Sequence, residues 1–146
     1  MPQRPRLFAG TFADNVRLGA PHASDDRVRR ALEDAGLGDL VRAMPRGIET
    51  AVGEGGRRLS LGEARRVAIA RAFARDAAVV VLDEPTANLD PASAAAVTHA
   101  VRRLCAGRTT LLITHDPLVA AGAQRTVTLV DGRLRDQTPP AEAMAA

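Results

Sequence analysis

Titratable side chains follow two apolar segments of the chain at the point where each segment ends. Asp83 and Glu84 come directly after the run 79–82, VVVL, and His115 comes directly after 109–114, TTLLIT. A buried strand that presents two carboxylates at its end can hold a metal ion or activate water in phosphate chemistry. Taken alone, the two acids also fit a solvated turn, and His115 alone fits a packed histidine. The chemistry therefore depends on whether the fold brings the two strand ends together.

The elements around these residues predict that it does. We expect strands over 78–83 and 109–114, with a helix over 91–106 between them whose ends carry a capping aspartate, a proline and a glycine. A strand, helix and strand in this order place the two strands parallel and side by side. Functional groups in such sheets lie beyond the carboxyl ends of the strands. Asp83 and His115 are thus expected at one edge of the same sheet.

The segments before and after this unit predict helices and a hairpin. Before the unit, we expect loop and short elements over 1–23, helices from Ser24 to Gly36 and from Asp39 to Met44, and a Gly-rich connection over 46–58. The next helix begins at the S-x-x-E capping box of Ser60 and Glu63. After the unit, we expect a hairpin over 126–134 and a disordered tail over 136–146. On the helix after Ser60, Val67, Ala68, Ala72 and Phe73 are expected to face the core. Arg65, Arg66 and Arg75 are expected to face water.

The composition is that of one soluble domain. The chain has 146 residues, 46% of them hydrophobic and 25% charged, and its longest apolar run, 77–82, is too short to span a bilayer. Its one cysteine, Cys105, suggests a reducing compartment. The formal net charge is only +3 and aromatic residues make up 2%, so we expect no nucleic-acid partner.

The order of these motifs resembles the nucleotide-binding domain of ATP-binding-cassette transporters. Leu59–Glu63 (LSLGE) resembles the signature motif, residues 79–83 resemble the Walker B strand, and Ala87–Asp90 (ANLD) resembles the D-loop. His115 matches the switch histidine and Gln3 matches the Q-loop glutamine. Thr50–Gly55 resembles the loop that exporters place before the signature to contact their membrane domains. The amino-acid sequence of residues 2–64 is most similar to that of the paired exporters of cysteine and glutathione used in cytochrome bd assembly.

The resemblance implies ATP and Mg²⁺ as ligands and assigns a role to each matching residue. It implies Glu84 and His115 as catalytic residues, Asp83 and Gln3 at the metal, and Gln3, Ser60, Leu61, Gly62, Glu63, Asp83 and Asp90 at the nucleotide. Three positions depart from the family's pattern. Leu61 replaces a glycine that approaches phosphate, Glu63 replaces a glutamine and is expected to act more as a helix cap, and Asn88 is a milder change. These departures favour one half of a heterodimer over a homodimer.

The implied fold class is α/β: a partial P-loop NTPase (RecA-like) core with parallel strands plus the α-helical subdomain of the family. We expect the helical subdomain over 24–76 and the core part over 77–135, within a partial domain over 1–135. The pattern G-x-x-x-x-G-K-[ST] is absent, because all 20 basic residues are Arg. The N-terminal P-loop part is therefore expected to be missing, and the chain alone to be inactive.

The implied partners are a second nucleotide-binding domain and transmembrane domains, which would place the chain at the cytoplasmic side of the cell membrane. Two alternatives remain open. The chain could be a non-catalytic remnant that only docks on a partner, or a fragment of a DNA-maintenance ATPase that shares the signature and Walker B motifs. The absence of coiled-coil heptads and the exporter-like loop over 50–55 disfavour the second alternative.

Overall fold

The computed structural model describes residues 6–136, and these divide into two units. The first unit is Met1–Thr114 and the second is His115–Ala146. Gln3 and the predicted tail after Asp136 lie outside the described residues.

The first unit is mainly helical. Its elements are β1 (Gly10–Thr11), α1 (Phe12–Arg17), α2 (Asp25–Asp34), α3 (Gly38–Arg42), a 3-10 turn (Gly47–Glu49), β2 (Ala51–Val52), α4 (Leu61–Arg75), β3 (Val79–Asp83), α5 (Pro91–Cys105) and β4 (Thr109–Ile113). The second unit contains α6 (Pro117–Ala120), β5 (Val127–Val130) and β6 (Arg133–Asp136).

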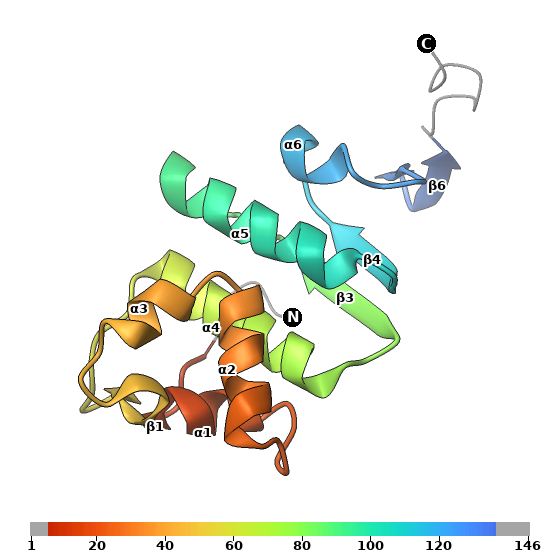
Figure 1. Cartoon of the computed structure of the whole chain (residues 1–146). Coiled ribbons are helices and arrows are strands. Elements are labelled where there is room, and N and C mark those ends of the chain that lie inside the picture. The colour runs from red at the N-terminus through yellow and green to blue at the C-terminus, as the bar shows by residue number, and fades with distance from the viewer. Residues whose placement is uncertain (1–5, 137–146) are drawn as a thin grey trace. The chain divides into compact units, whose positions relative to one another are not determined.

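Helix α4 occupies the centre of the first unit and packs against α1, α2 and α5 (Figure 1). Its buried residues lie on most of its faces, and many of them are alanine or glycine. Small side chains allow neighbouring helices to approach closely, so one helix can contribute to contacts on several sides. The core around it takes apolar side chains from α1, α2, α5 and β3, including Phe12, Leu32, Leu82 and Leu104.

The predicted strand–helix–strand unit is confirmed. Strands β3 and β4 are parallel and in register from Val79 opposite Thr109 to Asp83 opposite Ile113, so they end at the same edge. Val80 and Leu82 point into the core. The other face of this two-stranded sheet is apolar but exposed, and it is formed by Val79, Val81, Leu111 and Ile113. Parallel sheets are normally covered on both faces, so this face lacks the usual second layer within the described residues.

Local signals correctly predicted where most helices begin. Ser24, Ser60 and Asp90 are the N-caps of α2, α4 and α5, and each side chain accepts a hydrogen bond from a backbone N–H in the first turn. The short helix expected over Asp39–Met44 is found at Gly38–Arg42. The hairpin of β5 and β6 turns at Asp131 and Gly132, whose φ angles of 50° and 75° suit a type I′ turn.

Two expectations about the N-terminal half were incomplete. Helix α1 lies within the segment 1–23 that was expected to be loop and short elements; Thr11 and Asp14 form a capping box at its start. The connection 46–58 is partly ordered as sheet, because β2 pairs antiparallel with β1. The capping box of α1 is local, whereas the pairing of β1 with β2 joins residues far apart in the sequence.

The buried amide of Asn15 fastens the N-terminal segment to α4. Its Oδ1 accepts from the Phe8 N–H at 3.0 Å and from Arg71 Nη2 at 2.6 Å, and its Nδ2 donates to the carbonyls of Phe8 and Thr11. Arg71, on α4, also donates to the carbonyls of Arg6 and Asn15. Burial lowers the pKa of Arg71 from its ordinary value.

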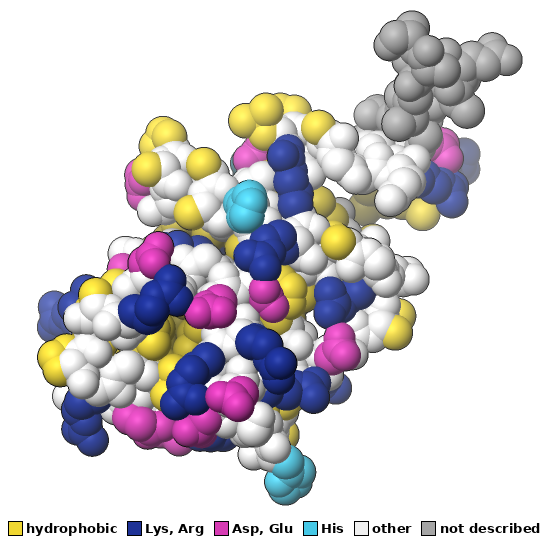
Figure 2. All heavy atoms as spheres, viewed as in Figure 1, with side chains coloured by type: hydrophobic (Ala, Val, Ile, Leu, Met, Phe, Trp, Pro, Cys, Tyr) yellow, Lys and Arg dark blue, Asp and Glu magenta, His cyan; other side chains and the backbone are white. Residues whose placement is uncertain are grey.

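Charges of both signs are interleaved on the surface of the helices, as the face drawn in Figure 2 shows. Several are paired in surface ion pairs, such as Arg17 with Asp25 and Arg42 with Glu33. Across residues 6–136, no helix is both long enough and apolar enough to cross a membrane.

Candidate functional site

The turn after β3 carries the two acids that the sequence singled out. Asp83 ends β3 and Glu84 follows it with a left-handed backbone, φ 45°, and both side chains are partly buried. The Glu84 N–H donates to the carbonyl of Ile113 at 2.9 Å, which fastens the turn to β4. Asn88, in the same turn, is also left-handed at φ 58°. Non-glycine residues persist in this region only where their surroundings hold them, and such positions concentrate at functional sites.

Arg65 lies against this turn, and the expectation that it faces water was wrong. Its side chain is almost completely buried, with the residue 2% exposed, and its Nη1 donates to the carbonyl of Pro85 at 2.8 Å. Burial lowers the pKa of Arg65, and the negative charge of Glu84 acts in the opposite direction. Arg66 is partly buried and Arg75 is exposed. Helix α4 is thus joined through Arg65 to the turn that carries Glu84.

The start of α4 is closed by the predicted capping box. The Glu63 N–H donates to Ser60 Oγ at 3.1 Å, and the Ser60 N–H donates to Glu63 Oε2 at 2.7 Å. The expectation that Glu63 acts as a cap is confirmed. Ser60 and Leu61 are exposed at this end of the helix, so a ligand can reach them.

Gly62 brings the start of α4 against the start of α5. A Cβ atom at Gly62 would lie 2.9 Å from Ser93 Cβ and 3.0 Å from Ser93 Oγ. The Ser93 N–H donates to Asp90 Oδ1 at 3.0 Å. The hydrogen bond from the Ser93 hydroxyl is the main reason that the pKa of Asp90 lies below its ordinary value, followed by the one from the Ser93 backbone. The two predicted motifs that contain Gly62 and Asp90 are therefore packed together through one serine.

Gly62→Ala is expected to destabilise the chain by about 1–3 kcal/mol, because the new methyl group overlaps Ser93 Cβ. Ser93→Gly removes that Cβ and should recover most of the loss in the double variant, whereas Ser93→Ala keeps it and should recover none. Urea unfolding of the single and double variants measures the coupling. The loss of stability caused by Gly62→Ala is compared between the Ser93→Gly background and the Ser93→Ala background. Equal losses in the two backgrounds would show that the overlap is not the cause.

The loop resembling the exporter contact loop is exposed at its tip and at Ala51. Glu54 and Gly55 are exposed, as expected for a loop that awaits a partner. If residues 50–56 contact membrane domains, the sequence predicts that they are exposed and poorly packed. For Val52 this prediction was wrong, because Val52 is fully buried in β2. A Cβ at Gly53 would lie 2.9 Å from the Phe8 carbonyl oxygen, so the base of the loop is also closely packed. The exposed tip, Glu54 and Gly55, is therefore flanked by the closely packed residues Val52 and Gly53.

Two predicted residues lie beyond what the first unit can test. Gln3 is outside the described residues, and His115 is the first residue of the second unit, where it is exposed. The strands that carry Asp83 and precede His115 do end at one edge. The approach of the His115 side chain to Asp83 stays a prediction.

The donor chemistry of the turn fits Mg²⁺. This ion takes one or two protein carboxylates, keeps several waters and takes further oxygens from substrate phosphates. Asp83 and Glu84 are neighbouring carboxylates at a strand end. Within residues 6–136, no three His, Cys, Asp or Glu side chains gather as a protein-only metal site.

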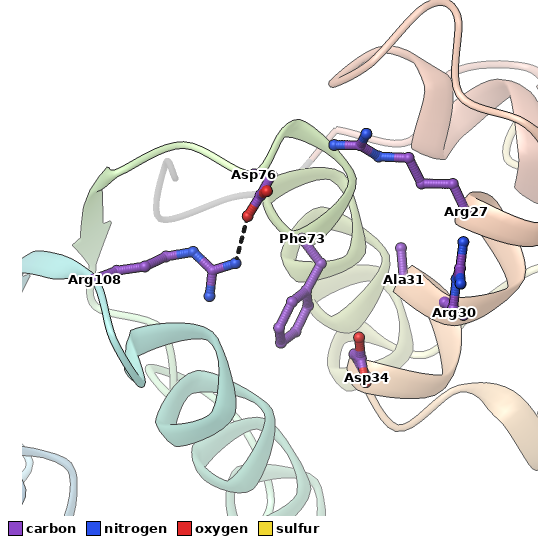
Figure 3. Close-up of a pocket in the computed structure, with 7 residues that line it drawn as sticks. All are labelled: Arg27, Arg30, Ala31, Asp34, Phe73, Asp76 and Arg108. Atoms are coloured by element: carbon purple, nitrogen blue, oxygen red, sulfur yellow. Dashed lines mark hydrogen bonds and ion pairs between the residues drawn. The ribbon is translucent and has the colours of Figure 1, made fainter.

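A pocket of about 300 Å³ lies away from this turn (Figure 3). It is lined by Arg27, Arg30, Ala31, Asp34, Phe73, Asp76 and Arg108. Arg108 points toward Asp76 and pairs with it at 2.8 Å, and Asp34 pairs with Arg103. Asp76 and Arg108 precede β3 and β4, so the pocket is at the start of these strands, whereas Asp83 is at the end.

Comparison with known proteins identifies the family. Residues 1–87 match the family described as ABC transporter, which is more than half of the chain. The chain belongs to the ABC transporter family. Its relatives include transporters of the exporter type, and it spans a quarter or less of the length of those described next.

Three relatives illustrate the range. The ATP-dependent lipid A-core flippase of Cupriavidus metallidurans is 44% identical over 93% of this chain and 23% of its own length. The mitochondrial potassium channel ATP-binding subunit of Pongo abelii is 42% identical over 90% of this chain and 18% of its own length. The glutathione/L-cysteine transport system ATP-binding/permease protein CydD of Bacillus subtilis is 38% identical over 99% of this chain and 25% of its own length.

Proposed function

We propose that this chain is part of the ATP-binding domain of an ABC exporter, and that within the complete transporter it helps couple ATP hydrolysis to transport. The observation that supports the proposal most directly is the left-handed Glu84 turn, fastened by the Ile113 carbonyl and joined to α4 through Arg65. The matched family and the exporter-type relatives give the turn its chemical context.

The residues that match the family's motifs then have the following roles. Glu84 orients and polarises the water that attacks the γ-phosphate, and His115 contacts the same phosphate. Asp83 and Gln3 would hold Mg²⁺, which would supply positive charge to the phosphates. Ser60 and the N–H groups at the start of α4 offer an anion site to the ATP that is held by the P-loop of the partner subunit. Leu61, Gly62, Glu63 and Asp90 shape the surface around that site.

The described fold is one part of that domain. We propose a helical subdomain over 24–76 and part of a RecA-like core over 77–135. The exposed apolar face formed by Val79, Val81, Leu111 and Ile113 would pack against the remainder of the core, which would supply the P-loop. These 146 residues contain no lysine, so the P-loop lysine must come from that remainder.

The partners proposed for the complete protein are a second nucleotide-binding domain and transmembrane domains at the cytoplasmic side of a membrane. Leu61 in place of glycine favours a partner subunit of different sequence. This segment is shared by relatives with different names: one name specifies glutathione and L-cysteine, and another specifies lipid A-core. A thiol exporter is the narrower proposal, because the sequence of residues 2–64 resembles the exporters of cysteine and glutathione and CydD is among the relatives.

The chain alone is expected to show no ATP turnover above background, and a complete subunit that includes this segment is expected to turn over ATP when paired. The reason is that phosphoryl transfer depends on a cradle for the β- and γ-phosphates as well as on the acid and the metal ligand. Phosphate release from both preparations at equal concentration measures this. A complete, paired subunit that binds ATP but has no turnover would instead support the non-catalytic docking hypothesis.

A further inference from the structure

The burial of Arg65 is costly unless something offsets it. A guanidinium taken out of water loses its hydration, and it is retained only where it finds hydrogen-bond acceptors and opposite charge. Arg65 is 2% exposed and donates to the Pro85 carbonyl at 2.8 Å. The charge of Glu84 partly opposes the lowering of the Arg65 pKa by burial, so the two groups interact electrostatically.

The neighbouring arginine shows that a carbonyl contact alone does not require burial. Arg66 donates through Nη1 to the carbonyl of Gly36 at 2.8 Å, near the surface of the helical region. The two residues belong to the same helix, and each holds a backbone carbonyl from a different segment. Only Arg65 holds a carbonyl of the turn that carries Glu84. Of the two arginines, Arg65 is therefore the one that joins α4 to the Glu84 turn.

The turn is held on both sides of Glu84. On one side the Glu84 N–H donates to the Ile113 carbonyl, and on the other the Pro85 carbonyl accepts from Arg65. The left-handed backbone of Glu84 costs about 1–3 kcal/mol and needs such anchors to persist. Loss of the second anchor would remove one of the two contacts that hold the backbone on either side of Glu84.

We propose that Arg65 is a positioning residue, which fixes the direction of the Glu84 carboxylate by holding the Pro85 carbonyl and thereby links the turn to the start of α4. This inference rests on the proposed function for its catalytic consequence, but its structural part does not. Because Ser60 caps the same helix, a ligand that displaces the start of α4 would also act on the Glu84 turn. Arg65 thus connects the start of α4, which would contact the ATP of the partner subunit, to Glu84, which would act on the ATP of its own subunit.

The structural part is tested on the 146-residue chain by amide hydrogen exchange. Arg65→Met keeps a long unbranched side chain but removes the donor, and it should speed exchange of the Glu84 and Leu89 amides by about tenfold. Arg65→Lys restores a donor and the charge and should return the rates toward those of the parent. Arg66→Met is the matched control and should leave this turn unchanged. Equal exchange in Arg65→Met and Arg66→Met at Glu84 would overturn the proposal.

A measurement on the parent chain covers the case in which Arg65→Met does not fold. The guanidinium of Arg65 should show hindered rotation and slowly exchanging Nη protons in ¹⁵N NMR, and these signals should shift in Glu84→Gln. A guanidinium of Arg65 that rotates freely would overturn the proposal without any variant at that position.

The catalytic part is tested in the complete, paired subunit. Arg65→Met should lower kcat for ATP by about tenfold or more and change KM by less than about twofold. Arg65→Lys should recover most of kcat. Arg66→Met, the control, should have the kcat of the parent per folded protein. In a Glu84→Gln background, Arg65→Met should have no further effect on kcat. The same loss in both backgrounds would overturn the positioning role. No loss from Glu84→Gln itself would instead count against the proposed function.

Discussion

Glu84→Gln in the complete, paired subunit is expected to lower ATP turnover at its own site by about 100-fold or more while ATP still binds. Glutamine keeps the length and planarity of the side chain, so the turn held by Ile113 and Arg65 should retain its shape. It loses the negative charge that would orient the attacking water and accept its proton. Binding depends on contacts elsewhere, because the P-loop supplies most of the phosphate contacts.

Turnover is measured by phosphate release at saturating ATP, and binding by displacement of a fluorescent nucleotide. The control is Glu33→Gln, which removes an exposed carboxylate whose ion pair with Arg42 contributes little. It should leave both quantities unchanged. An unchanged rate in Glu84→Gln, with the P-loop of the partner disabled, would mean that Glu84 is not the catalytic base.

The helices and the parallel strands could be predicted because their signals are local. Ser60 with Glu63, and Asp90 with Pro91, satisfy backbone N–H groups within a single turn, so a few consecutive residues determine where each helix begins. The pairing of β1 with β2 has no such signal. Each strand has two residues, and the pairing brings together Gly10 and Val52, which are far apart in the sequence.

The position of the two acids at a strand end could be predicted, whereas the burial of Arg65 was only partly indicated by the sequence. Asp83 and Glu84 follow an apolar run, and the end of such a strand is where functional groups lie. Arg65 was assigned to the surface because charged residues are rarely buried without a partner. Helical spacing carries the correct signal, since Arg65 falls on the same stripe as Gly62 and Ile69, which are both buried. Its partner, a backbone carbonyl after the strand, has no mark in the sequence.

Ser60 raises a separate question, because it stabilises the helix and is also proposed to bind phosphate. Its hydroxyl accepts from the Glu63 N–H at 3.1 Å, so Ser60→Ala removes a cap worth about 1 kcal/mol as well as the proposed phosphate contact. A single alanine variant cannot separate the two roles. Ser60→Asp can, since aspartate is as good an N-cap as serine but carries a negative charge that repels phosphate.

We expect Ser60→Asp to retain the stability of the parent and to lower turnover by at least about tenfold at the site whose P-loop belongs to the partner subunit. Ser60→Thr keeps both the cap and the hydroxyl and should stay within about threefold of the parent at both sites. The assay uses paired subunits in which one P-loop lysine at a time is replaced, so that each ATP site is measured alone. With only the partner's P-loop intact, Ser60→Asp should abolish most of the rate; with only this subunit's P-loop intact, the rate should be nearly unchanged. The reverse pattern would place Ser60 at its own subunit's nucleotide. Equal loss at both sites, with unfolding shifted to lower urea, would mean that the helix start is needed for folding and not for the partner's phosphate.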